Sequence, residues 1–286
     1  MEKYYTFEKI EKGITIEKFL KHFSKNYISN LKQNPIGVLV NKKPEKLNYT
    51  LKENDVLSIL KEPKITTTSV IKTNIPLDIV YEDDDILAVN KPSNISTIPS
   101  KRHFETSLAG MVLNNQSIST FRAINRLDKE ASGIVLIAKN SFISESLSNS
   151  IIEKTYYAIV ENIIEKEIVI EKNIETLTDQ QGKNILKRVI SENGKKAITH
   201  VSPIETKNNM TLCKIQITHG RTHQIRLHLS SVGHALVGDW LYGKKSTLIS
   251  RTALHLGEIA ICHPLTKKQI KIIAQIPDDM KKCMKD

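Results

Sequence analysis

One aspartate between two basic residues marks the first segment whose residues could take part in catalysis. Asp128 is flanked by Arg126 and Lys129, and the segment 125–133 ends in a Ser-Gly pair directly before an apolar run. Neighbouring cations favour the charged form of a carboxyl group, so Asp128 would stay ionised and could act as a nucleophile but not as an acid. From these residues alone, a simple salt bridge in a loop is the favoured interpretation.

The second segment, residues 219–228, is crowded with hydrogen-bond donors. Between residues 214 and 255 the sequence has six Lys or Arg and five of the nine histidines, whereas Asp239 is the single acid. Gly220 interrupts an apolar strand pattern just before a predicted helix, and such a junction offers free backbone N–H groups to a phosphate. A solvated surface usually mixes both charge signs, so this composition favours an anionic ligand.

Neither a metal site nor a disulfide framework is indicated. His219, His223 and His228 lack a partner Glu at the metalloprotease spacing and a clean fourth ligand. The three cysteines form no Cys-x-x-Cys pair, which argues against a zinc ribbon and against a secreted, disulfide-bonded protein. We therefore expect no metal site and a cytoplasmic location.

The elements that must position these segments are mostly strands. Period-two alternation or short apolar runs predict strands, and helical periodicity predicts two short helices. The predicted strands are 79–81, 86–89, 133–138, 155–160 and 212–218, and the predicted helices are 142–150 and 222–230. With many strands, few long helices and no regular βαβ repeat, the fold class is α+β with a mixed, largely antiparallel sheet.

A smaller unit precedes this sheet. Thr15 is a plausible N-cap for an amphipathic helix that begins at Ile16, and a second helix is expected at 28–33. Strands are expected at 38–40 and 56–60. This order resembles the small RNA-binding domain named after ribosomal protein S-four, although a small basic packing module remains the alternative. The predicted division is an RNA-binding domain at 1–62, a linker at 63–74 and a catalytic domain at 75–286.

The charge of the chain favours a polyanionic partner. The 286 residues include 42 Lys and Arg against 31 Asp and Glu, a net charge of +11. Residues 1–64 hold 13 Lys against 8 acids, so this short piece has a net charge of +5. Such a balance fits nucleic acid or an acidic membrane surface. The apolar run at 134–138 is far too short to cross a membrane, and we expect no membrane partner.

Taken together, the motifs resemble the RluA-type pseudouridine synthases. Ordered matches extend over about 200 residues, and the segment from Gly220 to His228 fits the family's Gly-Arg-Thr-His-Gln-Ile-Arg-x-His without a change. The other matching segments are Asn90–Asn94, Asn125–Gly133, Lys154–Val160, Gly233–Gly243, Leu254–His255 and His263–Pro264. Any one of these is a modest signal, but their number and order make a chance match very improbable.

The resemblance implies roles for individual residues. Asp128 stands at the catalytic aspartate, Tyr156 at the active-site tyrosine and Arg226 at the basic partner of the aspartate. Arg126 stands at the arginine that helps to hold the target base out of its stack, and the remaining substrate-binding candidates are Leu127, Arg221, His223 and Gln224. The implied reaction converts uridine in RNA to pseudouridine without a cofactor. Members of the family act on ribosomal or transfer RNA, and the predicted N-terminal RNA-binding domain favours large-subunit ribosomal RNA. A monomer is the expected state, because the catalytic domain must wrap around RNA.

Three positions depart from the family pattern. Asn125 replaces a His, Ala131 replaces a Thr, and Asn94 replaces a Gly. Asparagine tolerates a positive φ, so Asn94 can keep the backbone of the glycine that it replaces. The main alternative function is a non-catalytic RNA-binding protein of ribosome assembly with a decayed active site. A glycosidase that pairs Asp128 with an acid from 83–85 is a weaker alternative, because it needs two carboxylates at one site.

Overall fold

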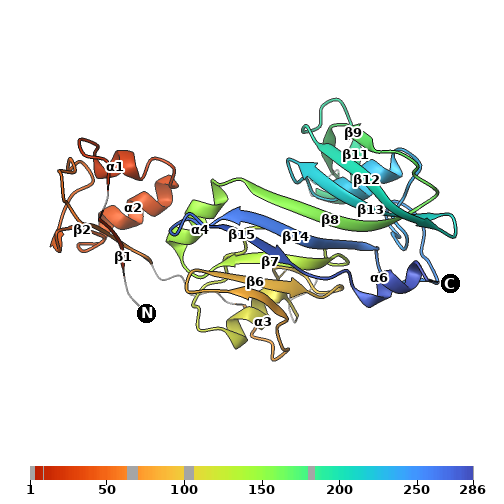
Figure 1. Cartoon of the computed structure of the whole chain (residues 1–286), viewed down its shortest axis with the longest axis horizontal. Coiled ribbons are helices and arrows are strands. Elements are labelled where there is room, and N and C mark those ends of the chain that lie inside the picture. The colour runs from red at the N-terminus through yellow and green to blue at the C-terminus, as the bar shows by residue number, and fades with distance from the viewer. Residues whose placement is uncertain (1–3, 9, 63–69, 100–105, 180–183, 286) are drawn as a thin grey trace.

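A nine-stranded sheet forms the main body of the chain (Figure 1). The computed structural model describes residues 4–8, 10–62, 70–99, 106–179 and 184–285. The order of strands is β5 (Ile79–Glu82), β6 (Ile86–Lys91), β7 (Ser132–Ala138), β14 (Leu254–Cys262), β8 (Ile152–Glu161), β13 (Met210–Thr218), β12 (Ile198–Lys207) and β9 (Ile168–Glu171), and β15 (Gln269–Ile273) pairs with β14.

The sheet is mixed and largely antiparallel, as the sequence predicts. Its one parallel pairing joins β7 to β14, where Gly133 lies opposite Leu256. Gly133 has a φ of 117°, and a Cβ there would lie 2.3 Å from the carbonyl oxygen of Leu256. Only glycine therefore allows the two strands to approach at this point, which lies directly after the loop that carries Asp128.

Strand β7 is buried over its whole length because helices cover both faces of its half of the sheet. Val135 and Ile137 pack in the cluster that includes α3 (Leu108–Asn115). Ile134 and Leu136 point to the opposite face and join the cluster that includes α4 (Ser141–Ser148). This packing makes the strand a rigid support for the loop before it.

Two further helices and a separate hairpin complete the main body. β10 (Ile174–Thr178) and β11 (Asn184–Ile190) form a two-stranded sheet of their own. Helix α5 (Gln224–Ser230) contacts β11 and β12, and α6 (Asp278–Cys283) lies near the end of the chain. In the part of the chain that the structure describes, no helix is both long and apolar enough to cross a membrane.

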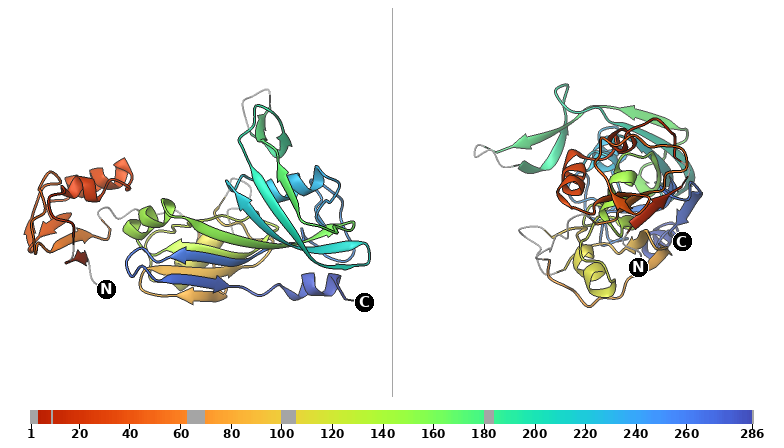
Figure 2. Two further views of the ribbon diagram at one scale, coloured as in Figure 1. Left: turned by 45° about the horizontal axis from the view of Figure 1, so that its top comes forward. Right: turned by 90° about the vertical axis from the view of Figure 1, so that its left-hand side faces the viewer.

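The N-terminal unit lies at one end of the elongated molecule (Figures 1 and 2). It consists of β1 (Tyr4–Phe7), α1 (Ile16–Phe19), α2 (Lys25–Gln33), β2 (Val38–Val40), β3 (Lys43–Pro44) and β4 (Leu57–Leu60), with the strands in the order β1-β4-β2-β3. Thr15 caps α1 by accepting a hydrogen bond from Lys18 N, as predicted. Helix α2 begins earlier than expected, because the Ser24 hydroxyl caps it.

Two expectations for this part of the chain stay predictions. The resemblance to the S-four domain is one of them, although two helices and a small antiparallel sheet agree with it. The linker is the other, because most of it, residues 63–69, lies outside the described residues. Strand β1 had no counterpart among the predicted elements, and it pairs with β4 at the edge of the small sheet.

Candidate active site

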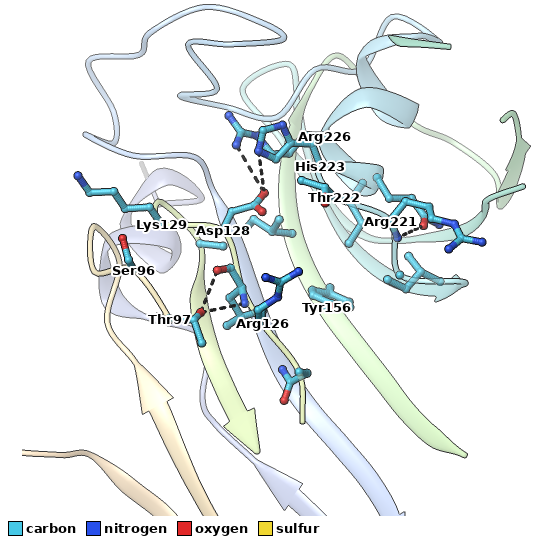
Figure 3. Close-up of a pocket in the computed structure, with 18 of the residues that line it drawn as sticks. Ser96, Thr97, Arg126, Asp128, Lys129, Tyr156, Arg221, Thr222, His223 and Arg226 are labelled. Carbon is cyan, nitrogen blue, oxygen red and sulfur yellow. Dashed lines mark hydrogen bonds and ion pairs between the residues drawn. The ribbon is translucent and has the colours of Figure 1, made fainter. Parts of the chain in front are cut away.

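Buried hydrogen bonds hold the loop that carries Asp128. At its start, the Asn125 side chain donates to one backbone carbonyl of β7 at 3.0 Å and accepts from a backbone N–H of β7 at 2.8 Å. The Thr97 hydroxyl accepts from Leu127 N at 3.2 Å and donates to Leu127 O at 3.0 Å (Figure 3). The backbone that leads into Asp128 is thereby fixed from two sides.

Lys91 holds the other end of this loop through hydrogen bonds to its backbone. Its ammonium group is fully buried and donates to the carbonyl oxygens of Ala131 at 2.6 Å and Lys129 at 3.4 Å, in addition to two carbonyls of its own turn. Burial lowers the pKa of Lys91 to about 7, whereas the charge of Asp128 opposes the shift. Lys91 was not among the predicted site residues, although it lies in the motif that begins at Asn90.

Arg226 joins the Asp128 loop to helix α5. Its guanidinium is 2% exposed and forms two parallel hydrogen bonds with the Asp239 carboxylate, at 2.7 and 2.8 Å. Its Nη1 lies 3.1 Å from Glu130 Oε2 and 3.5 Å from Asp128 Oδ2. Burial alone would lower the pKa of Arg226, but Asp239 and the other two carboxylates raise it, so the charge is permanent.

Tyr156 lies in the middle of β8 and lines the same cavity as Asp128 (Figure 3). Backbone pairing with Ile215 of β13 and Leu256 of β14 fixes its position in the sheet. Burial and the charge of Asp128 both raise the pKa of the Tyr156 hydroxyl, so the side chain is a neutral phenol at physiological pH. It can stack on a base and donate a hydrogen bond there.

His223 and Gln224 stand at the start of α5. His223 has a φ of 59°, and its Nε2 lies 3.9 Å from Asp128 Oδ2 while its Nδ1 lies 3.0 Å from the Tyr242 hydroxyl. Burial lowers the pKa of His223, although the charge of Asp128 opposes the shift. Gln224 is buried and its amide N–H groups bond to Ile198 O and other acceptors of β12 and β13. It therefore fixes the start of the helix.

The predicted residues line one cavity of about 750 Å³. Arg126 is exposed at its edge, and Leu127, Arg221, His223 and Gln224 contribute to its wall together with Asp128, Tyr156 and Arg226. The acids at 83–85 do not line it and lie in the turn between β5 and β6. Among the described residues, no group of His, Cys, Asp or Glu side chains is arranged to hold a metal ion.

Two departures from the family pattern have a structural explanation. Asn94 has a φ of 62°, so an asparagine keeps the left-handed backbone of the glycine that it replaces, as expected. Asn125 uses its amide to bond the backbone of β7 in both directions. The structure gives no replacement for the hydroxyl that Ala131 lacks.

Comparisons with known proteins agree with the geometry. The family model described as RNA pseudouridylate synthase matches residues 85–231. The chain is 32% identical over 270 residues to the RNA pseudouridine synthase YjbO of Bacillus subtilis. The matched region covers 92% of this chain and 94% of that protein. It is 30% identical over 230 residues to ribosomal large subunit pseudouridine synthase D of Zymomonas mobilis, covering 72% of this chain and 71% of that protein.

Solved structures share the fold. Human RNA pseudouridylate synthase domain containing 1 superposes with a TM-score of 0.60 at 23% identity, covering 73% of this chain and 87% of that chain. Human RNA pseudouridylate synthase domain containing 4 gives a TM-score of 0.56 at 19% identity, covering 72% and 90% of the two chains.

Proposed function

The chain belongs to the RNA pseudouridylate synthase family, RluA type, and is an isomerase of that kind; we propose that it acts on specific uridines of large-subunit ribosomal RNA. The net charge of +11 and the basic N-terminal unit support a large, structured RNA as the substrate. Relatives named for the large ribosomal subunit, at about 30% identity, favour ribosomal over transfer RNA.

One observation carries the assignment of the catalytic group. The Asp128 carboxylate lines the 750 Å³ cavity and lies 3.5 Å from the buried, permanently charged Arg226. The Arg226 guanidinium orients this carboxylate, which suits either attack on C1′ of the ribose or removal of a proton from the sugar.

The reaction is balanced within the nucleotide. The bond between N1 and C1′ breaks and leaves its electron pair on N1, the uracil turns, and C5 forms the new bond to C1′. The hydrogen on C5 then leaves as a proton to solvent through a base, and N1 regains a proton. Tyr156, as a neutral phenol, would stack on the uracil and relay the C5 proton, which its oxygen takes up as its own hydroxyl hydrogen passes to water. No cofactor enters this scheme.

The target uridine must leave its stack before it can reach Asp128. Extrusion of a base costs a few kcal/mol, which phosphate contacts of the basic surface would offset. Arg126 is exposed at the edge of the cavity, next but one to Asp128, and we assign it to the space that the extruded uridine leaves.

Release of tritium from C5 tests the proposal even while the target uridine is unidentified. Total RNA labelled with tritium at uracil C5, from cells of the source organism that lack this gene, would be incubated with the purified protein. We expect release with the wild type and none above background with Asp128→Asn, because the amide can neither attack C1′ nor accept a proton. Asp84→Asn, at an exposed position of the β5–β6 turn, is the matched control and should release as the wild type does.

Two results would contradict the proposal. Near-normal release by Asp128→Asn would exclude this aspartate as the catalytic group. Release from labelled transfer RNA but not from large-subunit ribosomal RNA would exclude the proposed substrate class.

A further inference from the structure

A second cavity of about 460 Å³ adjoins the one that holds Asp128. The two cavities have Arg188, Gly220, Arg221 and Thr222 in common. Arg188 lies on β11, whereas the other three residues lie between β13 and α5. These four residues therefore border both the proposed uridine site and a neighbouring hollow that the mechanism above does not use.

The second cavity has a positive lining. Arg188, Lys195 and Arg221 face a single acid of the lining, Glu175. No ion pair joins Arg188, Lys195 or Arg221 to a carboxylate of the described residues. Since unpaired cations attract anions in a partly enclosed site, this hollow suits a ligand with negative charge.

Hydrogen bonds hold Arg188 in place, but one of its side-chain donors lacks an acceptor among the described residues. Its backbone N–H donates to the Tyr242 hydroxyl at 2.7 Å, and its Nη1 donates to the carbonyl oxygen of Leu186 at 3.1 Å. Its Nε is buried and has no hydrogen-bond partner among the described residues. A buried N–H of this kind is rare in native proteins and calls for an acceptor that the described residues do not supply.

Tyr242 connects this arginine to the proposed catalytic groups. The same hydroxyl that accepts from Arg188 bonds to His223, and the Tyr242 ring lies 5.5 Å from the Arg226 guanidinium carbon. The Tyr242 side chain thus contacts Arg188, which lines both cavities, and two residues that line the Asp128 cavity. A ligand that continues from one cavity into the other would meet a preformed path.

We propose that the second cavity binds the phosphodiester next to the target uridine, with Arg188, Lys195 and Arg221 as donors to its oxygens. This inference rests on the proposed function, because it takes the ligand to be the RNA strand whose uridine enters the Asp128 cavity. A guanidinium presents several N–H groups in one plane, which matches the oxygens of a phosphate. Glu175 repels the phosphate on its own side and so favours a position at the Arg188–Arg221 wall.

Salt-dependent binding of a short oligouridylate tests the inference with a probe that does not depend on the natural target. The variant is Arg188→Gln with Lys195→Gln, and the control is Lys282→Gln with Lys285→Gln, which removes the same charge from exposed positions of the C-terminal segment. We expect the slope of log Kd against log salt to fall by about 0.7 for each phosphate that the variant no longer binds. The control should keep the wild-type slope. Equal slopes in variant, control and wild type would overturn the inference.

A second set of measurements separates this inference from the proposed function. In the tritium assay, the KM of the double variant should rise several-fold while its kcat changes less, because the site binds a part of the RNA that does not react. If wild type released no tritium, the proposed function would fail, and the salt slopes would still decide whether the cavity binds phosphate. Lys195→Gln alone is the control for a folding defect, because Lys195 is exposed. If the salt slope were unchanged in Lys195→Gln but lower in Arg188→Gln, only Arg188 would contact the phosphate.

Discussion

Arg226 distributes one positive charge among three carboxylates. Asp239, which is fully buried, takes the two parallel hydrogen bonds, and Glu130 takes the shorter contact with Nη1. Asp128 is left with the longest contact, 3.5 Å, and its side chain is 24% exposed. The carboxylate is therefore oriented by Arg226 without being fully neutralised, which keeps an oxygen available to the cavity.

Replacement of Arg226 by lysine tests this division of charge. A lysine cannot form two parallel bonds to Asp239, so Arg226→Lys should lower the free energy of unfolding by about 3 kcal/mol and kcat by about 100-fold. Urea unfolding and tritium release measure the two effects. Arg251→Lys is the matched control, because Arg251 is also buried and pairs with Asp279 through two hydrogen bonds. It should lose stability but keep kcat, and an equal loss of kcat in both variants would show a general folding effect.

The sequence indicated the side chains that we propose to react better than it indicated the residues that hold them in place. Asp128, Tyr156 and Arg226 came from ordered motifs, and the structure places all three at one cavity. Asp239 lay in a segment that by itself suggested only an ordered loop, since a buried ion pair depends on contacts that spacing does not express. Gln224 stays a predicted substrate-binding residue, and no sequence pattern indicated that its amide N–H groups donate to backbone carbonyls of β12 and β13.

At the scale of elements, the junction of β7 and β14 sets the position of the Asp128 loop. Ser132, the first residue of β7, bonds through its hydroxyl to His255 Nδ1 at 2.9 Å. His255 Nε2 lies 3.2 Å from the carbonyl oxygen of Ala274, so this nitrogen carries the proton and Nδ1 accepts from Ser132. Burial lowers the pKa of His255 to about 4, with a smaller contribution from the charge of Arg251.

This junction should make the protein sensitive to mild acid. The unfolded chain has a histidine pKa of about 6.5, so between pH 4 and 6.5 the unfolded state binds more protons at His255 and stability falls as the pH falls. The full shift corresponds to about 3 kcal/mol. Between pH 6.5 and 4, the free energy of unfolding measured in urea should fall less in His255→Gln than in the wild type, by about 3 kcal/mol. His200→Gln, at an exposed position, should follow the wild-type curve, and parallel curves for all three proteins would contradict the assignment.

Elements with a clear period were predictable, whereas those without one were not. β7, β8 and β13 were expected close to their observed bounds, because apolar runs and alternation mark buried strands. Helix α3 was missed because it is buried along an almost continuous apolar stretch, Leu108 to Leu113, and so lacks an amphipathic stripe. The parallel pairing of β7 with β14 joins residues more than 120 positions apart, which no local pattern can specify.

At the scale of the whole molecule, Phe142 fastens the N-terminal unit to the main body. Its ring centroid lies 4.7 Å from that of Tyr5, 4.9 Å from that of Phe23, and within 6.3 Å of those of Phe7 and Tyr27. Ser24 adds two hydrogen bonds to the Glu145 carboxylate, each 2.8 Å long. The described part of the N-terminal unit thus has a defined position relative to the main body rather than a place on a free tether.

Loosening this contact should weaken the binding of large RNA while the charges themselves remain. A tethered unit contributes through its effective concentration, which falls when it loses a fixed position, so Phe142→Ala should raise the Kd for a large-subunit ribosomal RNA transcript about tenfold. The salt slope should stay near the wild-type value, whereas deletion of residues 1–62 should lower both affinity and slope because it removes phosphate contacts. Phe121→Ala, which removes a partly buried ring packed against the cluster around α3, is the control for the loss of an aromatic ring. If Phe142→Ala bound the transcript as tightly as this control does, the N-terminal unit would act independently of its docking.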